Sequence, residues 1–156
     1  MFKKEQKMSN GVKIYIGADH AGFKLKEELK KFLENLGYNV KDMGAYKYNK
    51  EDDYPDFIIP AAKAVAKNSD SRGIVIGGSG QGEAMAANRI RGVRAALIYD
   101  KYSVKMSREH NDANIISLGA RTLSSRKAKK LVKLWLETSF SNGERHIRRI
   151  KKIEDF

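Results

Sequence analysis

The segment GIVIGGSGQGE, at residues 73–83, joins a short apolar run to a glycine-rich turn. The run Gly73–Ile76 is rich in β-branched residues, as is typical of a strand buried on both faces of a parallel sheet. Residues 84–89 follow the turn and are a helix candidate. A strand that leads through such a turn into a helix is the repeating unit of α/β proteins. The segment therefore predicts an α/β fold, provided that the same alternation continues on both sides of it.

Strand and helix patterns do alternate along the rest of the chain. The other strand candidates are the β-rich runs at residues 13–18, 39–43, 94–99 and 114–118. The other helix candidates are residues 23–36, 58–66 and 128–135, where apolar residues recur at helical spacing, and the polar segment 102–110. Five strands that alternate with helices predict one α/β domain, with a parallel sheet sandwiched between helix layers.

The chain has 156 residues, the usual size of one domain, and contains no internal repeat or linker. We expect residues 1–11 to be a flexible N-terminal extension and residues 12–142 to be the α/β domain. Residues 143–156 are predicted to form a basic helix that leaves the domain body. Its apolar residues Ile147, Ile150 and Ile153 recur at every third position, which indicates packing against another surface such as a second subunit.

The composition excludes several classes of protein and site. Hydrophobic residues make up 41% of the chain, unlike a disordered protein, and no apolar run is long enough to span a membrane. There is no cysteine, which excludes disulfides, thiolate zinc sites and cysteine nucleophiles. The N-terminal stretch MFKKEQKMSNG lacks the apolar segment of a signal peptide, so we expect a cytoplasmic protein.

Two loops are candidate binding sites, because ligands of open α/β sheets bind at the carboxyl ends of the strands. The first loop, GADHAG at residues 17–22, places the carboxylate of Asp19 beside the imidazole of His20. It is not a Walker phosphate loop, because Phe23 stands where that motif has lysine. Asp19 is either a ligand-binding residue or a cap of the following helix, since aspartate is favoured at helix N-termini.

The second loop, at residues 77–83, has four glycines in its first six positions. Such a loop lets the backbone approach a ligand closely, and its successive N–H groups can form a nest for an anion. The dinucleotide motif GxGxxG does not match, because Glu83 occupies the position of its third glycine. The helix dipole alone favours a carboxylate at Glu83, but a carboxylate beside an anion nest is also what proton abstraction next to a carbonyl requires. The residues leave both interpretations open.

Basic residues gather toward the C-terminal end of the chain. The net charge is +12, and residues 121–156 carry 11 of the 31 Lys and Arg but only 4 of the 19 Asp and Glu. Arg145 and Arg149 share a helix face at their spacing and could clamp one phosphate together with Arg121; the alternative is a solvated basic face. His110 is flanked by amides that can hold sugar hydroxyls, although a lone histidine in such a place is usually structural.

Five motifs in combination resemble one family: GADHAGFKLKE, DYPD, GIVIGGSGQGEAMAANRIRGVRAA, SREHNDANIISLGAR and GERHIRR. They are similar to the ribose-5-phosphate isomerase B family, within the group that includes the galactose-6-phosphate isomerase subunits, over residues 13–153. The resemblance implies a Rossmann-like three-layer α/β/α sandwich, with a five-stranded parallel sheet and a C-terminal helical extension. It also implies an aldose–ketose isomerase that interconverts ribose 5-phosphate and ribulose 5-phosphate through a cis-enediolate, without metal or organic cofactor.

The resemblance implies a binding role for both loops. Asp19 and His20 would contact the sugar phosphate. The enediolate oxygens would be held by the Ser79 side chain and by the backbone of Gly78, Ser79, Gly80, Gln81 and Gly82.

It further implies that Glu83 is the catalytic base, as in the branch of the family that places glutamate directly after the glycine loop. The other branch uses a cysteine before the loop, and this sequence has Gly77 there. His110 would open the furanose ring, with Asn111 beside it. The phosphate would be gripped by Arg121, Arg145 and Arg149.

The family's members are dimers whose active sites draw residues from both subunits. The resemblance therefore implies a homodimer with shared active sites, or a tetramer built from it. Three alternatives stay open: an isomerase of a six-carbon sugar phosphate such as allose or galactose 6-phosphate, a noncatalytic sugar-phosphate binding protein, and a nucleic-acid binding protein. Residues 121–156 contain no nucleic-acid motif and few aromatic residues, so we expect no nucleic-acid partner.

Overall fold

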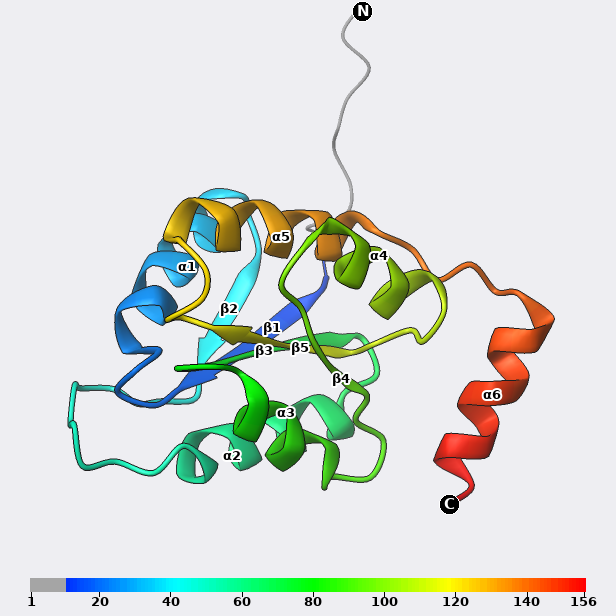
Figure 1. Ribbon diagram of the computed structural model, residues 1–156, viewed down its shortest axis with the longest axis horizontal. Coiled ribbons are helices and arrows are strands. Elements are labelled where there is room, and N and C mark those ends of the chain that lie inside the picture. The colour runs from blue at the N-terminus through cyan, green and yellow to red at the C-terminus, as the bar shows by residue number, and fades with distance from the viewer. Residues whose placement is uncertain (1–10) are drawn as a thin grey trace, which may run out of the picture.

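A computed structural model describes residues 11–156, in which five strands alternate with helices (Figure 1). Residues 1–10 lie outside the described part of the chain, so the predicted N-terminal extension stays a prediction. The strands are β1 (Lys13–Ala18), β2 (Asn39–Asp42), β3 (Ser71–Gly77), β4 (Ala95–Leu97) and β5 (Ile115–Gly119). The helices are α1 (Phe23–Asn35), α2 (Pro55–Lys67), α3 (Gln81–Asn88), α4 (Lys101–Glu109), α5 (Ser125–Glu137) and α6 (Glu144–Glu154).

All five strands are parallel and lie in the order β2-β1-β3-β5-β4. Helices α1, α4 and α5 cover one face of the sheet, and α2 and α3 cover the other (Figure 1). Each face has its own apolar core, with Trp135 and Leu29 fully buried on the first and Ile58 and Ala62 fully buried on the second. The predicted three-layer sandwich with a five-stranded parallel sheet is confirmed.

The strand register fixes where the loops of the carboxyl edge meet. Ala18 of β1 is paired with Ile76 of β3, and Gly77 of β3 is paired with Gly119 of β5. The three strands therefore end side by side, and the loops that follow them share one edge of the sheet.

Two element boundaries differ from the sequence-based expectation. Helix α3 begins at Gln81 rather than at residue 84, because Gly80 adopts a left-handed conformation (φ +79°) that turns the chain directly into the helix. Strand β4 is shorter than predicted. Side chains satisfy the backbone at both of its ends, since Asn114 accepts from Arg94 N and Ser103 accepts from Tyr99 N.

A buried ion pair holds α1 against β2. Lys26 is fully buried, and its ammonium group lies 2.8 and 2.7 Å from the two carboxylate oxygens of Asp42 and 2.7 Å from the Ala45 carbonyl. Glu27 lies 3.0 Å from the same ammonium group, and Lys30 also contacts Asp42. Burial alone would raise the pKa of Asp42, but hydrogen bonds from the two lysines lower it below its ordinary value.

Helix α6 leaves the domain body, as predicted for residues 143–156 (Figure 1). Its apolar side chains are only partly covered within the chain, with Ile147 48% and Ile153 59% exposed. An ion pair between Arg94 and Glu154 ties the end of the helix to the segment before β4. Within residues 11–156, no helix has the length and apolar character needed to cross a membrane.

Candidate active site

The glycine-rich loop after β3 lies at the carboxyl edge, joined to the loop after β5. Ala120 N donates to the Gly77 carbonyl (2.8 Å) and Arg121 N donates to the Gly78 carbonyl (3.0 Å). The Arg121 guanidinium lies over Gly78, where a Cβ atom would be only 2.9 Å from its Nη1. The first N–H groups of a helix have no partner within it, so the start of α3 directs backbone donors toward this edge, and one of them, Gln81 N, donates to Ser79 Oγ (3.3 Å). The arrangement suits an anion or a developing oxyanion.

Glu83 is a buried carboxylate at this edge. It lies in the first turn of α3 and is only 4% exposed. Its carboxylate occupies the space next to the Gly77 α-carbon, where a Cβ atom would overlap Oε1. Burial raises the pKa of Glu83, backbone hydrogen bonds from Glu83 itself and from Gly80 oppose this effect, and the negative charge of nearby Asp19 adds to it, so that the pKa lies above its ordinary value. A carboxyl group whose pKa is shifted toward neutrality is well suited to general-base catalysis.

Asp19 and His20 form the neighbouring wall, in the turn between β1 and α1. Asp19 is buried, and its Oδ1 accepts a hydrogen bond from Gly22 N (3.1 Å). Asp19 therefore closes the turn before the helix; the N-cap itself is Gly22, which has no side-chain cap. The alternative interpretation of Asp19 as the cap of α1 is wrong, because the helix begins one turn later than that role requires.

Two residues of the loop before α2 complete this wall, and sequence reasoning gave neither of them a role. Asp52 Oδ1 accepts from the His20 backbone N–H (3.0 Å) and contacts His20 Nδ1 (2.7 Å). The ring of Tyr54 packs against Gly82, where a Cβ atom would lie 2.6 Å from its hydroxyl oxygen. The only sequence signal was the DYPD motif, which begins at Asp53 and therefore omits Asp52.

The side chains of Asp19, His20 and Asp52 each offer one possible metal ligand atom, all within 4.8 Å of one another. Carboxylates and imidazole suit several divalent cations. In this structure, however, the His20 and Asp52 atoms are joined by the 2.7 Å contact, and Asp19 is engaged with Gly22. The three residues are therefore already held by hydrogen bonds within the chain.

The other predicted site residues lie at the opposite edge of the sheet. His110 caps the end of α4, which runs antiparallel to the strands, and β5 begins only five residues later. Since a strand rises by about 3.3 Å per residue, the five-residue β5 separates His110 from the carboxyl edge by roughly 16 Å. His110 therefore cannot reach a ligand that Glu83 of the same chain contacts directly.

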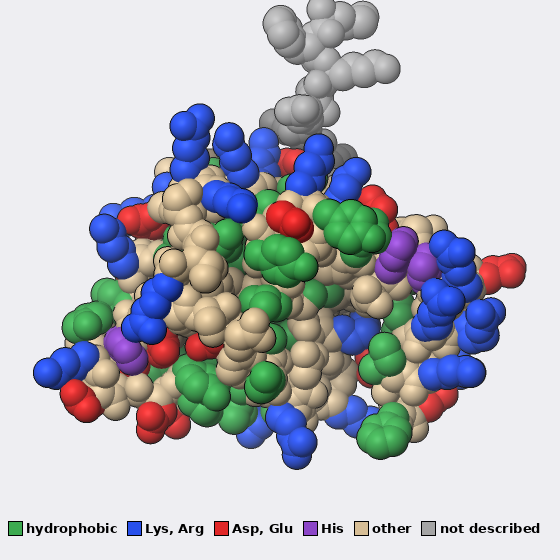
Figure 2. Space-filling model, viewed as in Figure 1, with side chains coloured by type: hydrophobic (Ala, Val, Ile, Leu, Met, Phe, Trp, Pro, Cys, Tyr) green, Lys and Arg blue, Asp and Glu red, His purple; other side chains and the backbone are tan. Residues whose placement is uncertain are grey.

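His110 is stacked on His146 of α6, with ring centroids 4.1 Å apart and an angle of 14° between the rings. Burial lowers the pKa of His146, and the neighbouring positive groups lower it further. Figure 2 shows two adjacent histidine side chains beside a group of basic side chains, on the side of the molecule away from the third histidine. The stacked pair thus forms a second, separate polar centre.

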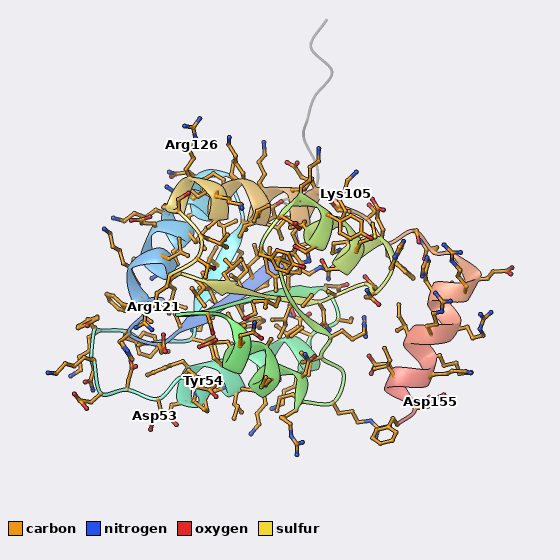
Figure 3. The ribbon with its side chains drawn as sticks, in the orientation of Figure 1. Asp53, Tyr54, Lys105, Arg121, Arg126 and Asp155 are labelled. Carbon is orange, nitrogen blue, oxygen red and sulfur yellow. The ribbon has the colours of Figure 1, made fainter. Side chains whose placement is uncertain are left out.

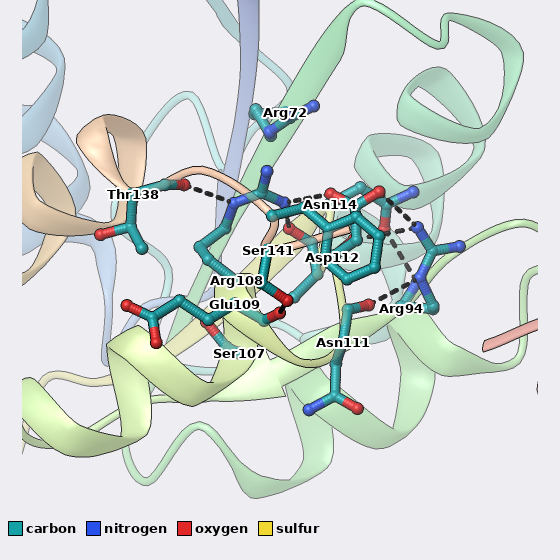
Figure 4. Close-up of polar contacts among 12 residues, drawn as sticks. Arg72, Arg94, Ser107, Arg108, Glu109, Asn111, Asp112, Asn114, Thr138 and Ser141 are labelled. Carbon is teal, nitrogen blue, oxygen red and sulfur yellow. Dashed lines mark hydrogen bonds and ion pairs between the residues drawn. The ribbon is translucent and has the colours of Figure 1, made fainter. Parts of the chain in front are cut away.

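A network of arginines holds the loop that carries His110 and Asn111 (Figure 4). Arg94 donates to the carbonyls of Asn111 (3.0 Å) and Asp112 (2.9 Å). Arg108 donates to Asp112 Oδ1 (2.7 Å), and Asp112 itself has a positive φ of 43°. These bonds fix a strained turn, which a non-glycine residue adopts only when its surroundings compensate for the strain.

The structure thus divides the predicted site residues into two groups. Figure 3 shows Arg121 and Tyr54 on one side of the molecule and Asp155, which directly follows α6, on the other. The carboxyl-edge group comprises Asp19, His20, Gly78, Ser79, Gly80, Gln81, Gly82, Glu83 and Arg121. The second group comprises His110, Asn111, Arg145 and Arg149. Within one chain, Arg121 does not converge with Arg145 and Arg149 on a common phosphate.

Comparison with known proteins places this geometry in a family. A model of the family described as Ribose/Galactose Isomerase matches residues 14–153. The ribose-5-phosphate isomerase B of Mycolicibacterium paratuberculosis is 41% identical over 145 residues, which cover 93% of this chain and 91% of the relative.

Solved structures give the same result. The ribose-5-phosphate isomerase B of Clostridium thermocellum superposes with a TM-score of 0.88 at 46% identity, covering 92% of this chain and 95% of that one. The Mycoplasma genitalium enzyme, solved with bound ribulose 5-phosphate, superposes with a TM-score of 0.89 at 39% identity and the same coverage. Sequence and fold agree, and the chain belongs to the ribose/galactose isomerase family.

Proposed function

We propose that the protein is an aldose–ketose isomerase that interconverts ribose 5-phosphate and ribulose 5-phosphate. The observation that carries the proposal is the buried Glu83 carboxylate, with its raised pKa, at the start of α3 beside the glycine loop. The relatives named above, including one solved with bound ribulose 5-phosphate, support the same substrate. A cytoplasmic location stays a prediction from the sequence.

The chemistry of the reaction assigns the role of Glu83. After the sugar ring opens, a base must remove the C2 proton and return a proton to C1 through a cis-enediolate. One carboxylate can do both, because the two carbons are neighbours and the proton stays on the same face of the substrate. Backbone donors of the glycine loop and the start of α3 would stabilise the oxyanion, and one such donor contributes about 3 to 4 kcal/mol in other enzymes. Arg121 would grip the phosphate.

The second group of residues would act on the substrate of another copy of the chain. His110 would open the ring, and Arg145 and Arg149 would grip the phosphate, in a homodimer whose two active sites each draw on both subunits. The separation of roughly one strand length between Glu83 and His110 supports this assignment. So do the partly exposed isoleucines of α6, which offer an apolar surface to a partner.

A coupled assay on ribose 5-phosphate tests the substrate, with allose 6-phosphate and galactose 6-phosphate as further arms and with chelator present or absent. We expect turnover of ribose 5-phosphate that chelator does not reduce. Glu83→Gln should reduce turnover to a small residual rate while ribulose 5-phosphate still binds in calorimetry. A Glu83→Gln variant with near-normal kcat would remove Glu83 from the role of base.

Mixing of inactive variants tests the shared active site. Glu83→Gln and His110→Ala are each expected to be inactive on cyclic ribose 5-phosphate. In a twofold-symmetric dimer reassembled from equal amounts of both, half of the dimers are mixed and each contains one intact site, so about a quarter of the wild-type activity should return. Recovery of no activity, although mass spectrometry detects mixed dimers, would contradict the shared site.

A further inference from the structure

Asp52 contacts His20 at two points, the backbone and the imidazole ring. Its Oδ1 accepts a hydrogen bond from the His20 backbone N–H (3.0 Å) and lies 2.7 Å from the ring nitrogen Nδ1. A carboxylate oxygen can only accept at such a distance, so the hydrogen between the two atoms belongs to Nδ1. The ring nitrogen Nε2 has no hydrogen bond with any of the described residues.

The contact between Asp52 and the His20 ring is largely shielded from solvent on the Asp52 side. The Asp52 side chain is only 7% exposed, whereas that of His20 is 26% exposed. Asp52 Oδ2 is buried without a hydrogen-bond partner among residues 11–156, so Asp52 is anchored through Oδ1 alone. The contact with His20 is therefore the side-chain bond that positions this carboxylate among the described residues.

The loop that carries Asp52 is itself folded against His20. Asp52 N donates to the Asn49 carbonyl (3.1 Å), and Glu51 N donates to the Asn49 side chain (3.0 Å), which closes a local turn. Tyr48 meets the His20 ring edge to face, with centroids 6.3 Å apart. The loop therefore fixes the position of the carboxylate relative to the ring.

We propose that Asp52 is a positioning residue that holds His20 in the Nδ1–H form and directs Nε2 toward the bound sugar phosphate. The inference rests on the proposed function, in which His20 contacts that ligand. With Nδ1–H held by Asp52, Nε2 of the neutral ring accepts from a sugar hydroxyl, and Nε2–H of the protonated ring donates to a phosphate oxygen. Neither interaction requires the ring to turn over, so the contact with the ligand is prepared before binding.

The tautomer can be read without any substrate. The chain has three histidines, so ¹⁵N-detected imidazole spectra recorded at about pH 8.5, two units above the ordinary pKa of histidine, assign each ring from single His→Gln variants. We expect His20 in the Nδ1–H form in the wild type, and a shift toward the Nε2–H form in Asp52→Ala. A wild-type His20 in the Nε2–H form would overturn the proposal.

Kinetics separate positioning from a merely structural role. Asp52→Ala should raise KM for ribose 5-phosphate about 10- to 100-fold, because a charged hydrogen bond to the ligand-binding ring is lost, while kcat changes by less than about threefold. Asp52→Asn keeps an acceptor oxygen for Nδ1–H, so its KM should stay within about fivefold of the wild-type value. Glu51→Gln, an exposed carboxylate in the same loop, is the matched control and should leave KM unchanged.

The outcomes separate this inference from the proposed function. If Asp52→Ala does not fold, the tautomer of His20 in the wild type and the KM of Asp52→Asn still test the positioning role. Equal losses in both Asp52 variants, or a loss in kcat without one in KM, would refute the positioning role. A wild-type protein that does not turn over ribose 5-phosphate would refute the proposed function instead, while the tautomer of His20 would still test its bond to Asp52.

Discussion

Gly77 leaves the space that the Glu83 carboxylate fills, and this pairing can be tested by adding one methyl group. A Cβ atom at Gly77 would overlap Glu83 Oε1 and lie 2.7 Å from Oε2. Unbonded carbon and oxygen atoms rest at about 3.5 Å or more, so the carboxylate of Gly77→Ala must move by roughly 2 Å. The backbone itself has no reason to change, because Gly77 is not among the glycines with positive φ.

The expected effect is large on catalysis and small on stability. A displacement of about 1 Å in a catalytic group can lower kcat by about 100-fold, which equals about 2.7 kcal/mol of activation free energy. The unfolding free energy should change by less than about 1 kcal/mol, since alanine restricts the unfolded chain and the Glu83 side chain can rotate aside. Gly77→Ala should therefore be a folded protein with a misplaced base.

A double-mutant cycle shows whether the methyl group acts through Glu83. Gly77→Ala, Glu83→Gln and the double variant are assayed for residual turnover of ribose 5-phosphate, with urea denaturation as the control for folding. Because the base is already lost in Glu83→Gln, the added methyl group should cost less than about threefold in that background. The reasoning fails if Gly77→Ala keeps a kcat within threefold of the wild type, or if the double variant loses a further 100-fold.

Further predictions concern pH, stability and ring opening. Because the pKa of Glu83 is raised, kcat/KM should fall on acidification at a pH above the ordinary glutamate value of 4.5, and an acid limb below 4.5 would contradict this. For the same reason ionised Glu83 destabilises the fold, so Glu83→Gln should unfold at a higher urea concentration at neutral pH. Asp42→Asn removes the main counter-charge of buried Lys26 and should cost about 3 kcal/mol at pH 7, measured by urea denaturation. Because the pKa of Asp42 is lowered, this stabilisation is present above pH 3.8 and disappears as the pH falls through the lowered pKa. A destabilisation by Asp42→Asn that persists at a pH well below that pKa would contradict the prediction. His110→Ala should lose activity on cyclic ribose 5-phosphate but be partly spared on an acyclic substrate, and equal losses on both would refute a role in ring opening.

The fold could be predicted because its signals are local and periodic. The β-branched run at Gly73–Ile76 and the apolar stripes of the helices identify each layer without knowledge of the partners. The predicted element boundaries were wrong where a boundary depends on the conformation of one residue or on a side-chain contact. The start of α3 follows from the left-handed Gly80, and the ends of β4 follow from bonds made by Asn114 and Ser103. Such contacts leave no periodic trace in the sequence.

The candidate site was predictable where topology alone brings residues together. The rule that ligands bind at the carboxyl ends of parallel strands identifies Asp19, His20 and Glu83 as candidates from the sequence alone. Asp52 and Tyr54 were missed because they lie in an irregular loop after the short strand β2. Their positions depend on how that loop packs against the turn after β1 and the start of α3, and no spacing in the chain encodes these contacts.

The arrangement of the two polar centres follows from the direction of the chain in an α/β fold. A helix between parallel strands returns the chain to the amino edge, so a residue at the end of α4, such as His110, must lie far from the loop that follows β3. A reaction that needs both His110 and Glu83 at one substrate therefore cannot be completed by a single copy of this fold without rearranging the sheet. Placing two copies so that the amino edge of one meets the carboxyl edge of the other solves the problem, and by symmetry it creates two identical sites. Helix α6, which extends beyond the domain with isoleucines partly exposed, is the element of the structure best placed to support that contact.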